Sequence, residues 1–529
     1  MSKPASVNEN VLKVGSLTGL SRVLGLVREM LTSRLVGAGL YQSAFVFAFT
    51  IPNLFRKFFG EGALSVAFVP VFKEEIEQGR RESAEQLARA VSSAMASILA
   101  LICLVAILVI TAVLPTVEPD GRVSAVLRMT RIMLPYAVFI CTAAFAMGVQ
   151  NAHGRFARAA AAPSILNIVW IGTLIALFFF PDVPVRRRVF IVAWAVLVSG
   201  ILQLAFLLHA VWRNGIRLLP TAVGWNSALA RTVWRNTGIG VIGMGAVQIN
   251  LVLDNVLALW AAPWAPAAIS YAERLVYLPL GIVATAFATV LLPTLAGHFA
   301  HGDLDGAKTT FLTSVEDVLL LAIPAAAGLM LLSHDIVTII YQGGEFKARD
   351  ALRVSRALFC YAPGLLFFSL NKILTPWFHA QKDMKTPVRV SLAMVGANFT
   401  LNVLMVLTLP VEWKHAGIAG STVVCSLASS AFLAGKASQR NGHMGLRALL
   451  KPARRMTAAC LLMIAAVACV RHQVYATMGT GRLASLTVVG AGIVAAVAVY
   501  GVAVWLLCPD ATRRVLMIRR HPRHRTNPT

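Results

Sequence analysis

Long apolar stretches dominate the chain from residue 11 to residue 508. Each is close to or above the roughly 20 residues that a helix needs to cross the hydrocarbon core of a bilayer. The pattern predicts fourteen membrane-spanning helices, at residues 11–38, 42–72, 88–115, 128–151, 161–181, 188–211, 236–261, 267–296, 311–335, 354–379, 387–409, 415–436, 454–471 and 484–508. We therefore expect an all-α polytopic membrane protein.

The first predicted helix carries a row of polar and small residues along its apolar sequence. Because a helix turns about 100° per residue, positions spaced by three, four and seven residues share one face. This face contains Thr18, Ser21, Arg22, Gly25, Arg28, Glu29 and Thr32. A charge in the middle of a membrane helix costs about 2.5 to 3.5 kcal/mol on insertion scales, so the face should contact protein or water and not lipid.

Two more predicted helices repeat this arrangement. The second has Asn53, Arg56, Gly60 and Ala63 on one side, flanked by Lys57 and Glu61, and the eighth has Tyr271, Arg274 and Gly281 beside Glu273. Arginine exceeds acid on these faces, and the surplus positive charge favours an anionic ligand. A guanidinium group matches phosphate with two parallel hydrogen bonds, whereas an ammonium group does not. We predict that the arginines converge on one cavity.

Part of this charge also has a purely structural interpretation. Arg34 and Lys57 lie near predicted helix ends, where long basic side chains commonly extend to the lipid headgroups. Internal ion pairs with Glu29, Glu61 and Glu273 would account for part of the remaining positive charge. The sequence leaves both interpretations open beside ligand binding.

Internal repetition predicts two related halves. The segments GALSVAFVP (62–70) and TAFATVLLP (285–293) both end an apolar helix with proline. QNAHGRFARAAAAPSILN (150–167) and AQKDMKTPVRVSLAMVGAN (380–398) both contain a basic loop, a proline and an asparagine inside the membrane. An even number of helices per half predicts parallel copies, related by a pseudo-two-fold axis along the membrane normal. We expect an N-lobe of six helices at 1–222, a C-lobe of six at 223–443, and two extra helices with a basic tail at 444–529.

Composition supports the membrane assignment and locates the charge. The chain of 529 residues is 57% hydrophobic and 13% charged, with a mean hydropathy of +0.72 and a net charge of +25. The positive-inside rule favours cytoplasmic termini, which places the basic segments 435–456 and 513–525 in the cytoplasm. There they would face anionic lipid and not nucleic acid. The run RRR (186–188) conflicts with this topology, because it falls in an external loop.

Motifs for enzyme chemistry are missing from the sequence. It contains no HExxH motif and no cysteine and histidine spacing typical of a metal site. The segment HGDLDGAKTT (301–310) has Ala307 between glycine and lysine, which excludes a Walker A loop and an ATP-driven pump. No paired carboxylates or activated nucleophile indicate a glycosyltransferase or a phosphatase. We expect a protein that is not an enzyme and has no organic cofactor.

Five segments resemble one protein family. SRVLGLVRE (21–29), GAG (37–39), IPNLFRKFFGEGALSVAFVPVFKE (51–74), YAERLVYLPLGIVATAFATVLLP (271–293) and QKDMKTPVRV (381–390) are similar to the MurJ (MviN) family of lipid II flippases. That family belongs to the multidrug/oligosaccharidyl-lipid/polysaccharide exporter superfamily. The likeness runs from about residue 8 to residue 510.

This resemblance implies a transporter of the bacterial inner membrane that serves peptidoglycan synthesis and cell shape. It would move undecaprenyl-pyrophosphate-linked precursor from the cytoplasmic to the outer leaflet by alternating access. Its pyrophosphate site would be formed by Arg22, Arg28, Arg56 and Arg274, which match the family's essential arginines, with Asn53, Glu29 and Glu61 beside them. The last two helices would hold the lipid tail. The expected partners are lipid II, membrane lipids and cell-wall synthesis proteins, and the expected state is a monomer.

The sequence also departs from the family. Ser43 stands where many members have an aspartate, and Glu29 replaces an aspartate. Some members bind sodium, and Asp254 with Asn398 and Asn402 is the nearest match to that site, although Asp254 paired with a neighbouring polar group is the alternative. Another lipid-linked oligosaccharide flippase, or a cation-coupled multidrug exporter of the same superfamily, remains the alternative function.

Overall fold

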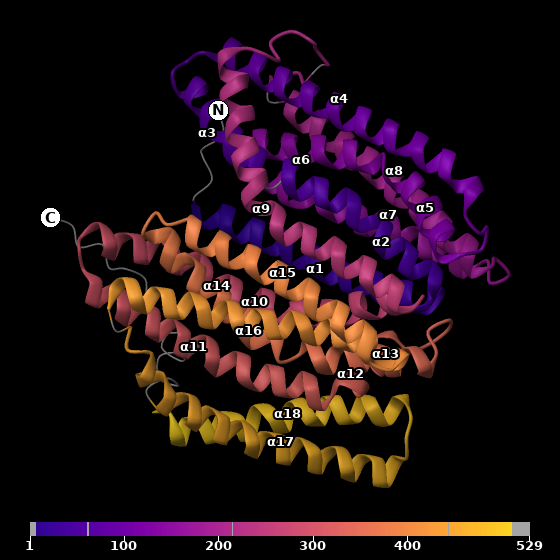
Figure 1. Ribbon diagram of the computed structural model, residues 1–529, viewed down its shortest axis with the longest axis vertical. Coiled ribbons are helices and arrows are strands. Elements are labelled where there is room, and N and C mark those ends of the chain that lie inside the picture. The colour runs from indigo at the N-terminus through magenta and orange to yellow at the C-terminus, as the bar shows by residue number, and fades with distance from the viewer. Residues whose placement is uncertain (1–6, 61–62, 214, 219, 443, 510–529) are drawn as a thin grey trace. The chain divides into compact units, whose positions relative to one another are not determined.

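The protein is almost entirely helical. The computed structural model describes residues 7–60, 63–213, 215–218, 220–442 and 444–509, and within them the helices are joined by short turns (Figure 1). The described residues form two compact units, one with residues up to Ala267 plus Gly343–Lys347, the other with Ala268–Gln342 and the residues from Ala348 onward. The predicted lobe boundaries at residues 222 and 443 stay a prediction, and the predicted basic segment 513–525 lies outside the described residues.

The first unit contains nine α-helices, counted over the described residues, and one π-helical turn. They are α1 (Val7–Val36), α2 (Leu40–Phe55), the π turn (Arg56–Gly60), α3 (Ala63–Glu77), α4 (Arg81–Val113), α5 (Arg122–Met133), α6 (Tyr136–Ala152), α7 (Phe156–Phe178), α8 (Val185–Trp212) and α9 (Ala228–Ala261). Helix α1 packs along α7. This pairing brings the polar face of α1 against a second transmembrane helix.

The second unit continues the helical pattern to the end of the described chain. Its helices are α10 (Ala265–Ala300), α11 (Leu304–Leu331), α12 (Ser333–Tyr341), α13 (Ala348–Tyr361), α14 (Gly364–Ala380), α15 (Lys385–Thr408), α16 (Val411–Asn441), α17 (Leu450–Met478) and α18 (Arg482–Leu507).

Every predicted span overlaps a helix of the structure. Among the described residues, eight helices are long and apolar enough to cross a membrane by themselves. The pairs α5–α6 and α13–α14 qualify as two further spans, bent by 42° and 43°. Proline stands at each bend, at Pro135 and Pro363, where it cannot donate the backbone hydrogen bond that would continue the helix. The total of fourteen crossings stays a prediction.

The second predicted span, 42–72, contains a π-helical turn that the sequence did not predict. Helix α2 ends at Phe55, and the π turn Arg56–Gly60 follows before α3 begins at Ala63. A π turn adds a residue to the helical repeat, so the positions after it rotate away from the face predicted from a uniform helix. The predicted common face of Asn53, Arg56, Gly60 and Ala63 stays a prediction, because residues 61 and 62 lie outside the described residues.

In the run RRR (186–188), Arg186 pairs with Asp120 at 2.9 Å and Arg188 forms hydrogen bonds to the backbone. Arg188 is only 8% exposed, and its guanidinium donates to the carbonyl oxygens of Leu35, Pro181 and Val183 at 3.0, 2.6 and 2.7 Å. These carbonyls lie at the end of α1 and in the loop before α8, where no helical partner is available. The run lies in the first turn of α8 and not in a loop, and Arg188 has a structural role there.

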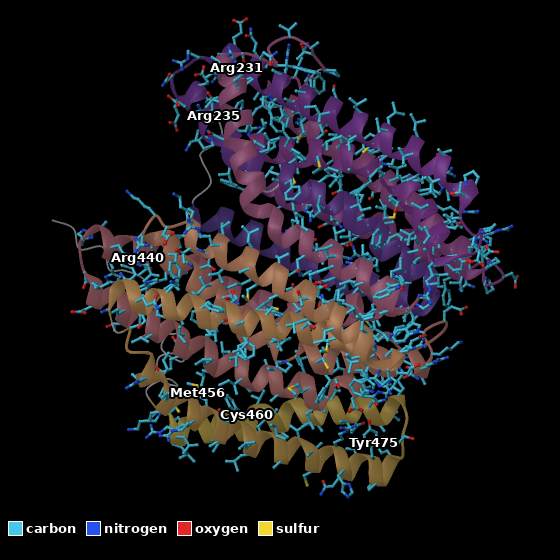
Figure 2. All side chains as sticks on the ribbon, in the orientation of Figure 1. Arg231, Arg235, Arg440, Met456, Cys460 and Tyr475 are labelled. Atoms are coloured by element: carbon cyan, nitrogen blue, oxygen red, sulfur yellow. The ribbon has the colours of Figure 1, made fainter. Side chains whose placement is uncertain are left out.

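Helices α17 and α18 form a hairpin at the C-terminal end of the second unit (Figure 1). Met456 and Cys460 of α17 are buried against the unit, and Tyr475 lies near the other end of the same helix (Figure 2). The Tyr475 hydroxyl donates a hydrogen bond to the fully buried carboxylate of Asp335 on α12, which also accepts one from Ser485 of α18 at 3.1 Å. Arg471 of α17 also forms an ion pair with Asp335 at 3.4 Å, so polar contacts hold this end of the hairpin to α12.

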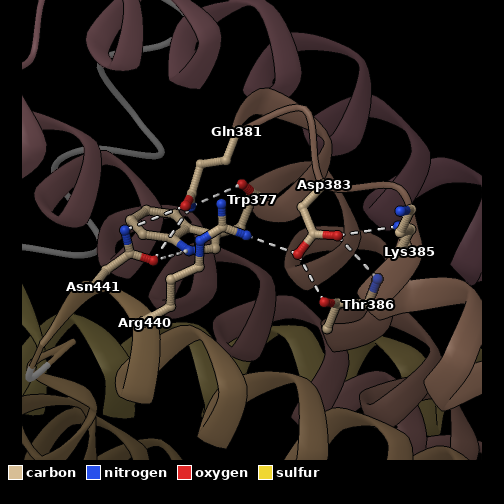
Figure 3. A network of polar contacts seen from close by, with 7 residues as sticks. All are labelled: Trp377, Gln381, Asp383, Lys385, Thr386, Arg440 and Asn441. Atoms are coloured by element: carbon tan, nitrogen blue, oxygen red, sulfur yellow. Dashed lines mark hydrogen bonds and ion pairs between the residues drawn. The ribbon is translucent and has the colours of Figure 1, made fainter.

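The segment between α14 and α15 is held by a polar network (Figure 3). Asp383 accepts hydrogen bonds from the backbone nitrogens of Lys385 and Thr386 at 3.1 and 3.0 Å, which caps the start of α15. Arg440, at the end of α16, forms an ion pair with Asp383 at 2.8 Å. The QKDMKTPVRV motif thus fixes this turn to the end of α16.

Candidate anion-binding site

One side of α1 borders an open cleft in the first unit. The cleft has a volume of about 430 Å³ and is lined by Ser21, Arg22, Met147, Asn151, Phe156, Ala159, Ala160 and Pro163. Arg22 is exposed, so its guanidinium group is accessible to a ligand in the cleft. The Arg22 guanidinium, the Asn151 amide and the Ser21 hydroxyl supply several hydrogen-bond donors suited to the oxygen atoms of a phosphate.

Arg28, two turns along α1, lies in a different environment. It is 6% exposed, and its Nη2 contacts Glu29 Oε1 at 2.6 Å. Its Nη1 donates to Asn167 Oδ1 at 2.9 Å, and its guanidinium carbon lies 4.4 Å from the centre of the Trp170 ring. The internal ion pair that the sequence left open is therefore present for Arg28.

Arg56 begins the π turn and contacts Asn53. Its Nε lies 3.4 Å from Asn53 Oδ1, while the Asn53 amide donates to the Phe49 carbonyl oxygen at 3.1 Å. π turns within α-helices are common at functional sites, because they redirect side chains. The structure brings these two predicted site residues together. Glu61 lies outside the described residues.

Arg274 and Glu273 are neighbours on α10 of the second unit, and both are half-buried. Tyr271, on the same predicted face, is buried and packs on Tyr341 with ring centres 4.8 Å apart. Tyr271 therefore contributes to packing within this unit. The predicted convergence of the four arginines on one cavity stays a prediction, since Arg274 belongs to a different unit from the others.

The residues of the predicted cation site have polar neighbours. Asn250 donates a hydrogen bond to Asp254 Oδ2 at 3.0 Å, one turn away on α9. On α15, Asn402 donates to Asn398 Oδ1 at 2.9 Å, and Asn398 Nδ2 lies 3.4 Å from Thr422 Oγ1. Within the described residues, no three histidine, cysteine or acidic side chains are grouped as metal ligands. Sodium binding stays a prediction.

Ser43, where an acid was expected from the family, is fully buried. Its hydroxyl oxygen accepts a hydrogen bond from the backbone nitrogen of Ala267 at 3.2 Å. Serine therefore supplies an acceptor in the first unit without burying a charge, which would carry a large desolvation cost.

Sequence reasoning did not assign Asn167 and Trp170 to the site. Both lie on α7, are almost fully buried and contact Arg28. The sequence held one signal for them, because Asn167 is the asparagine that ends the repeated segment 150–167.

Comparison with known proteins places the chain among membrane transporters. A family model described as lipid II flippase MurJ matches residues 32–489. A relative from Rhizobium tropici, named probable lipid II flippase MurJ, is 33% identical over 406 residues, which cover 76% of each chain. Another from Bdellovibrio bacteriovorus, with the same name, is 30% identical over 510 residues and 94% of each chain. A relative from Burkholderia cenocepacia, named lipid II flippase MurJ, is 33% identical over 401 residues.

Solved structures share the fold. The structure titled lipid II flippase MurJ, inward closed conformation, superposes with a TM-score of 0.76 at 21% identity, over 94% of this chain and 99% of the other. An inward-facing multidrug resistance MATE family transporter of the MOP superfamily gives a TM-score of 0.65 at 14% identity, over 81% of this chain and 98% of the other. The helical architecture is therefore that of a polytopic transporter.

Proposed function

Because the chain belongs to the lipid II flippase MurJ family, we propose that it moves lipid II from the cytoplasmic to the outer leaflet of the bacterial inner membrane. The observation that carries this proposal is the polar face of α1, which brings the exposed Arg22 to a cleft of about 430 Å³. On the predicted topology this cleft lies toward the cytoplasm. It would receive the pyrophosphate of the lipid while the polyprenyl tail stays in the bilayer.

The proposed mechanism is alternating access without covalent chemistry. A pyrophosphate cannot cross hydrocarbon alone, so a cationic cavity must replace the water around it during passage. We assign substrate binding to Arg22, Arg28, Arg56 and Arg274, with Asn53, Glu29 and Glu61 as neighbours. Moving one charge through 100 mV is worth about 2.3 kcal/mol. An inside-negative potential would therefore help expel the anion and return an empty cationic cavity.

The test is external exposure of lipid II in cells that depend on each variant, with the protein level checked by blot. Alanine at Arg22, Arg28, Arg56 or Arg274 should abolish exposure while the protein still inserts. Lysine keeps the charge but loses the paired hydrogen bonds, so it should be damaging at two or more of these positions. Arg22 is the sharpest position, because it is exposed to the cleft and its loss removes no core packing.

Arg34→Lys is the matched control on the same helix. Arg34 lies in the last turn of α1, and the change should be nearly silent if its role is to reach the headgroups. Normal lipid II exposure with the alanine variants of Arg22, Arg56 and Arg274 would exclude phosphate binding by these residues.

A cation-coupled multidrug exporter is the second candidate, favoured by the fold shared with MATE transporters. The cation site that the family resemblance implies, Asp254 with Asn398 and Asn402, is a separate proposal that does not depend on which candidate function is correct. If sodium drives this protein, Asp254→Asn should reduce transport in a sodium-dependent way. Equal activity of the variant and the parent at all sodium concentrations would exclude the site.

A further inference from the structure

Asn167 of α7 connects two points on α1. Its side-chain oxygen accepts a hydrogen bond from Arg28 Nη1 at 2.9 Å, and its side-chain nitrogen donates to the backbone carbonyl of Ser21 at 3.1 Å. The residue is 6% exposed. A buried amide whose two ends are both used has one defined orientation, because reversing it would place donor against donor.

Trp170 lies one turn after Asn167 and covers the guanidinium group of Arg28. The distance from the guanidinium carbon to the ring centre is 4.4 Å, which is a cation–π contact in a desolvated position. The ring is held in turn by edge contacts with Phe45 and Phe49, with ring centres 5.0 and 5.9 Å away. Trp170 is 3% exposed, so its orientation is set by packing.

These contacts fix the rotation of α1 against α7. Ser21 and Arg28 are seven residues apart on α1, and both contact the same side-chain amide of Asn167. A helix held at two points on the same face cannot roll about its axis without breaking one of the contacts. Arg22 directly follows Ser21 and lines the cleft, so its direction depends on this rotation.

We propose that Asn167 and Trp170 are positioning residues for anion binding: they hold Arg28 and set the direction in which Arg22 enters the cleft. The inference rests on the proposed function, because the anion is taken to be the phosphate of the lipid substrate. The equivalent asparagine of the repeated motif, Asn398, instead contacts Asn402 and Thr422. The positioning role is proposed for the N-terminal copy of the motif.

The chemistry explains why this position needs an amide. An aspartate at 167 would keep an acceptor for Arg28 but lose the donor to the Ser21 carbonyl. It would also place a second carboxylate near Glu29, beside an arginine that is already paired. Both effects should weaken the binding of an anion, although aspartate has nearly the same shape as asparagine.

The experiment measures binding of lipid II to the purified full-length protein in detergent. Asn167→Asp and Asn167→Leu should each weaken binding about tenfold or more, the factor that corresponds to about 1.4 kcal/mol. Trp170→Leu should act in the same direction, and Trp170→Phe, which keeps a flat ring, should restore most of the affinity. The matched controls are Asn255→Leu, whose amide donates to the Leu251 carbonyl oxygen of its own helix, and Trp194→Phe on an exposed face of α8. Both controls should bind like the parent.

A double-mutant cycle tests whether Asn167 affects lipid II binding through Arg28. In an Arg28→Ala background, Asn167→Leu should cause a smaller loss of binding than in the parent, because one of the two groups that it positions is gone. The same cycle is read from thermal unfolding, which needs no ligand and should show coupling between Arg28 and Asn167. Equal loss of binding in both backgrounds, or binding by Asn167→Asp equal to the parent, would overturn the positioning role. If the parent protein binds no lipid II, the proposed function and the positioning role for anion binding both fail. Coupling in the unfolding cycle would then show only that the contact between Arg28 and Asn167 stabilises the fold.

Discussion

The turn between α12 and α13 offers a direct test of a long-range contact. Residues Gly343–Lys347 pack with the first unit, where the backbone nitrogen of Glu345 donates to the Arg34 carbonyl oxygen at 2.8 Å. Gly344 has a φ of +57°, and a Cβ atom added there would lie 2.3 Å from the same carbonyl oxygen. Gly344→Ala should therefore disrupt this contact at the end of α1.

The expected cost has two parts. A side chain in the left-handed region costs about 1 to 2 kcal/mol, and loss of the hydrogen bond between Glu345 and Arg34 costs about 1 kcal/mol more. Displacement of the backbone around the clash adds to both, so we expect about 2 to 4 kcal/mol in total. Gly154→Ala is the control, because Gly154 has a φ of +71° but no atom within 4 Å of the added Cβ. It should cost about 1 to 2 kcal/mol, from the backbone conformation alone.

The assay is thermal unfolding of the purified variants, combined with hydrogen exchange at the Glu345 amide. Gly344→Ala should lower the melting temperature clearly more than Gly154→Ala and speed exchange at Glu345. Equal melting temperatures for the two variants, with unchanged exchange, would refute the assignment of this turn to the end of α1.

Two more predictions concern stability. Asp335→Ala should lower the melting temperature more than Asp335→Asn and should speed hydrogen exchange in α17 and α18. Alanine removes the acceptor of the Tyr475 and Ser485 hydroxyls, and each hydrogen bond to a charged group contributes about 1.5 to 3 kcal/mol. Equal melting temperatures for the two variants would contradict this. Glu75 lies outside the predicted spans, and hydrogen bonds from Arg80 lower the pKa of its carboxyl from 4.5 to about 2. The stabilisation by the ionised Glu75 carboxyl is therefore present above pH 4.5 and lost as the pH falls towards 2. The melting temperature of Glu75→Gln should lie below that of the parent at pH 7 and equal it near pH 2. A difference between the two melting temperatures that does not change with pH would contradict this.

The sequence by itself determined where the helices lie and which face of α1 is polar. Hydropathy and helical periodicity are local properties, so the stretch 11–38 and its row of polar residues could be recognised without knowledge of any partner. The same reasoning did not predict the π turn at Arg56–Gly60, because nothing in the local pattern indicated it.

Only the tertiary structure decided what the polar face contacts. Arg28 and Asn167 are 139 residues apart, and the Ala-, Val- and Leu-rich helices between them do not specify which pairs will pack. In a membrane the lipid is as apolar as the protein interior, so burial of hydrophobic side chains does not select a neighbour. The pairing of helices is therefore determined by the few polar contacts and by close packing. For this reason the roles of Asn167, Trp170 and the turn at Gly344 could be recognised only in the folded structure.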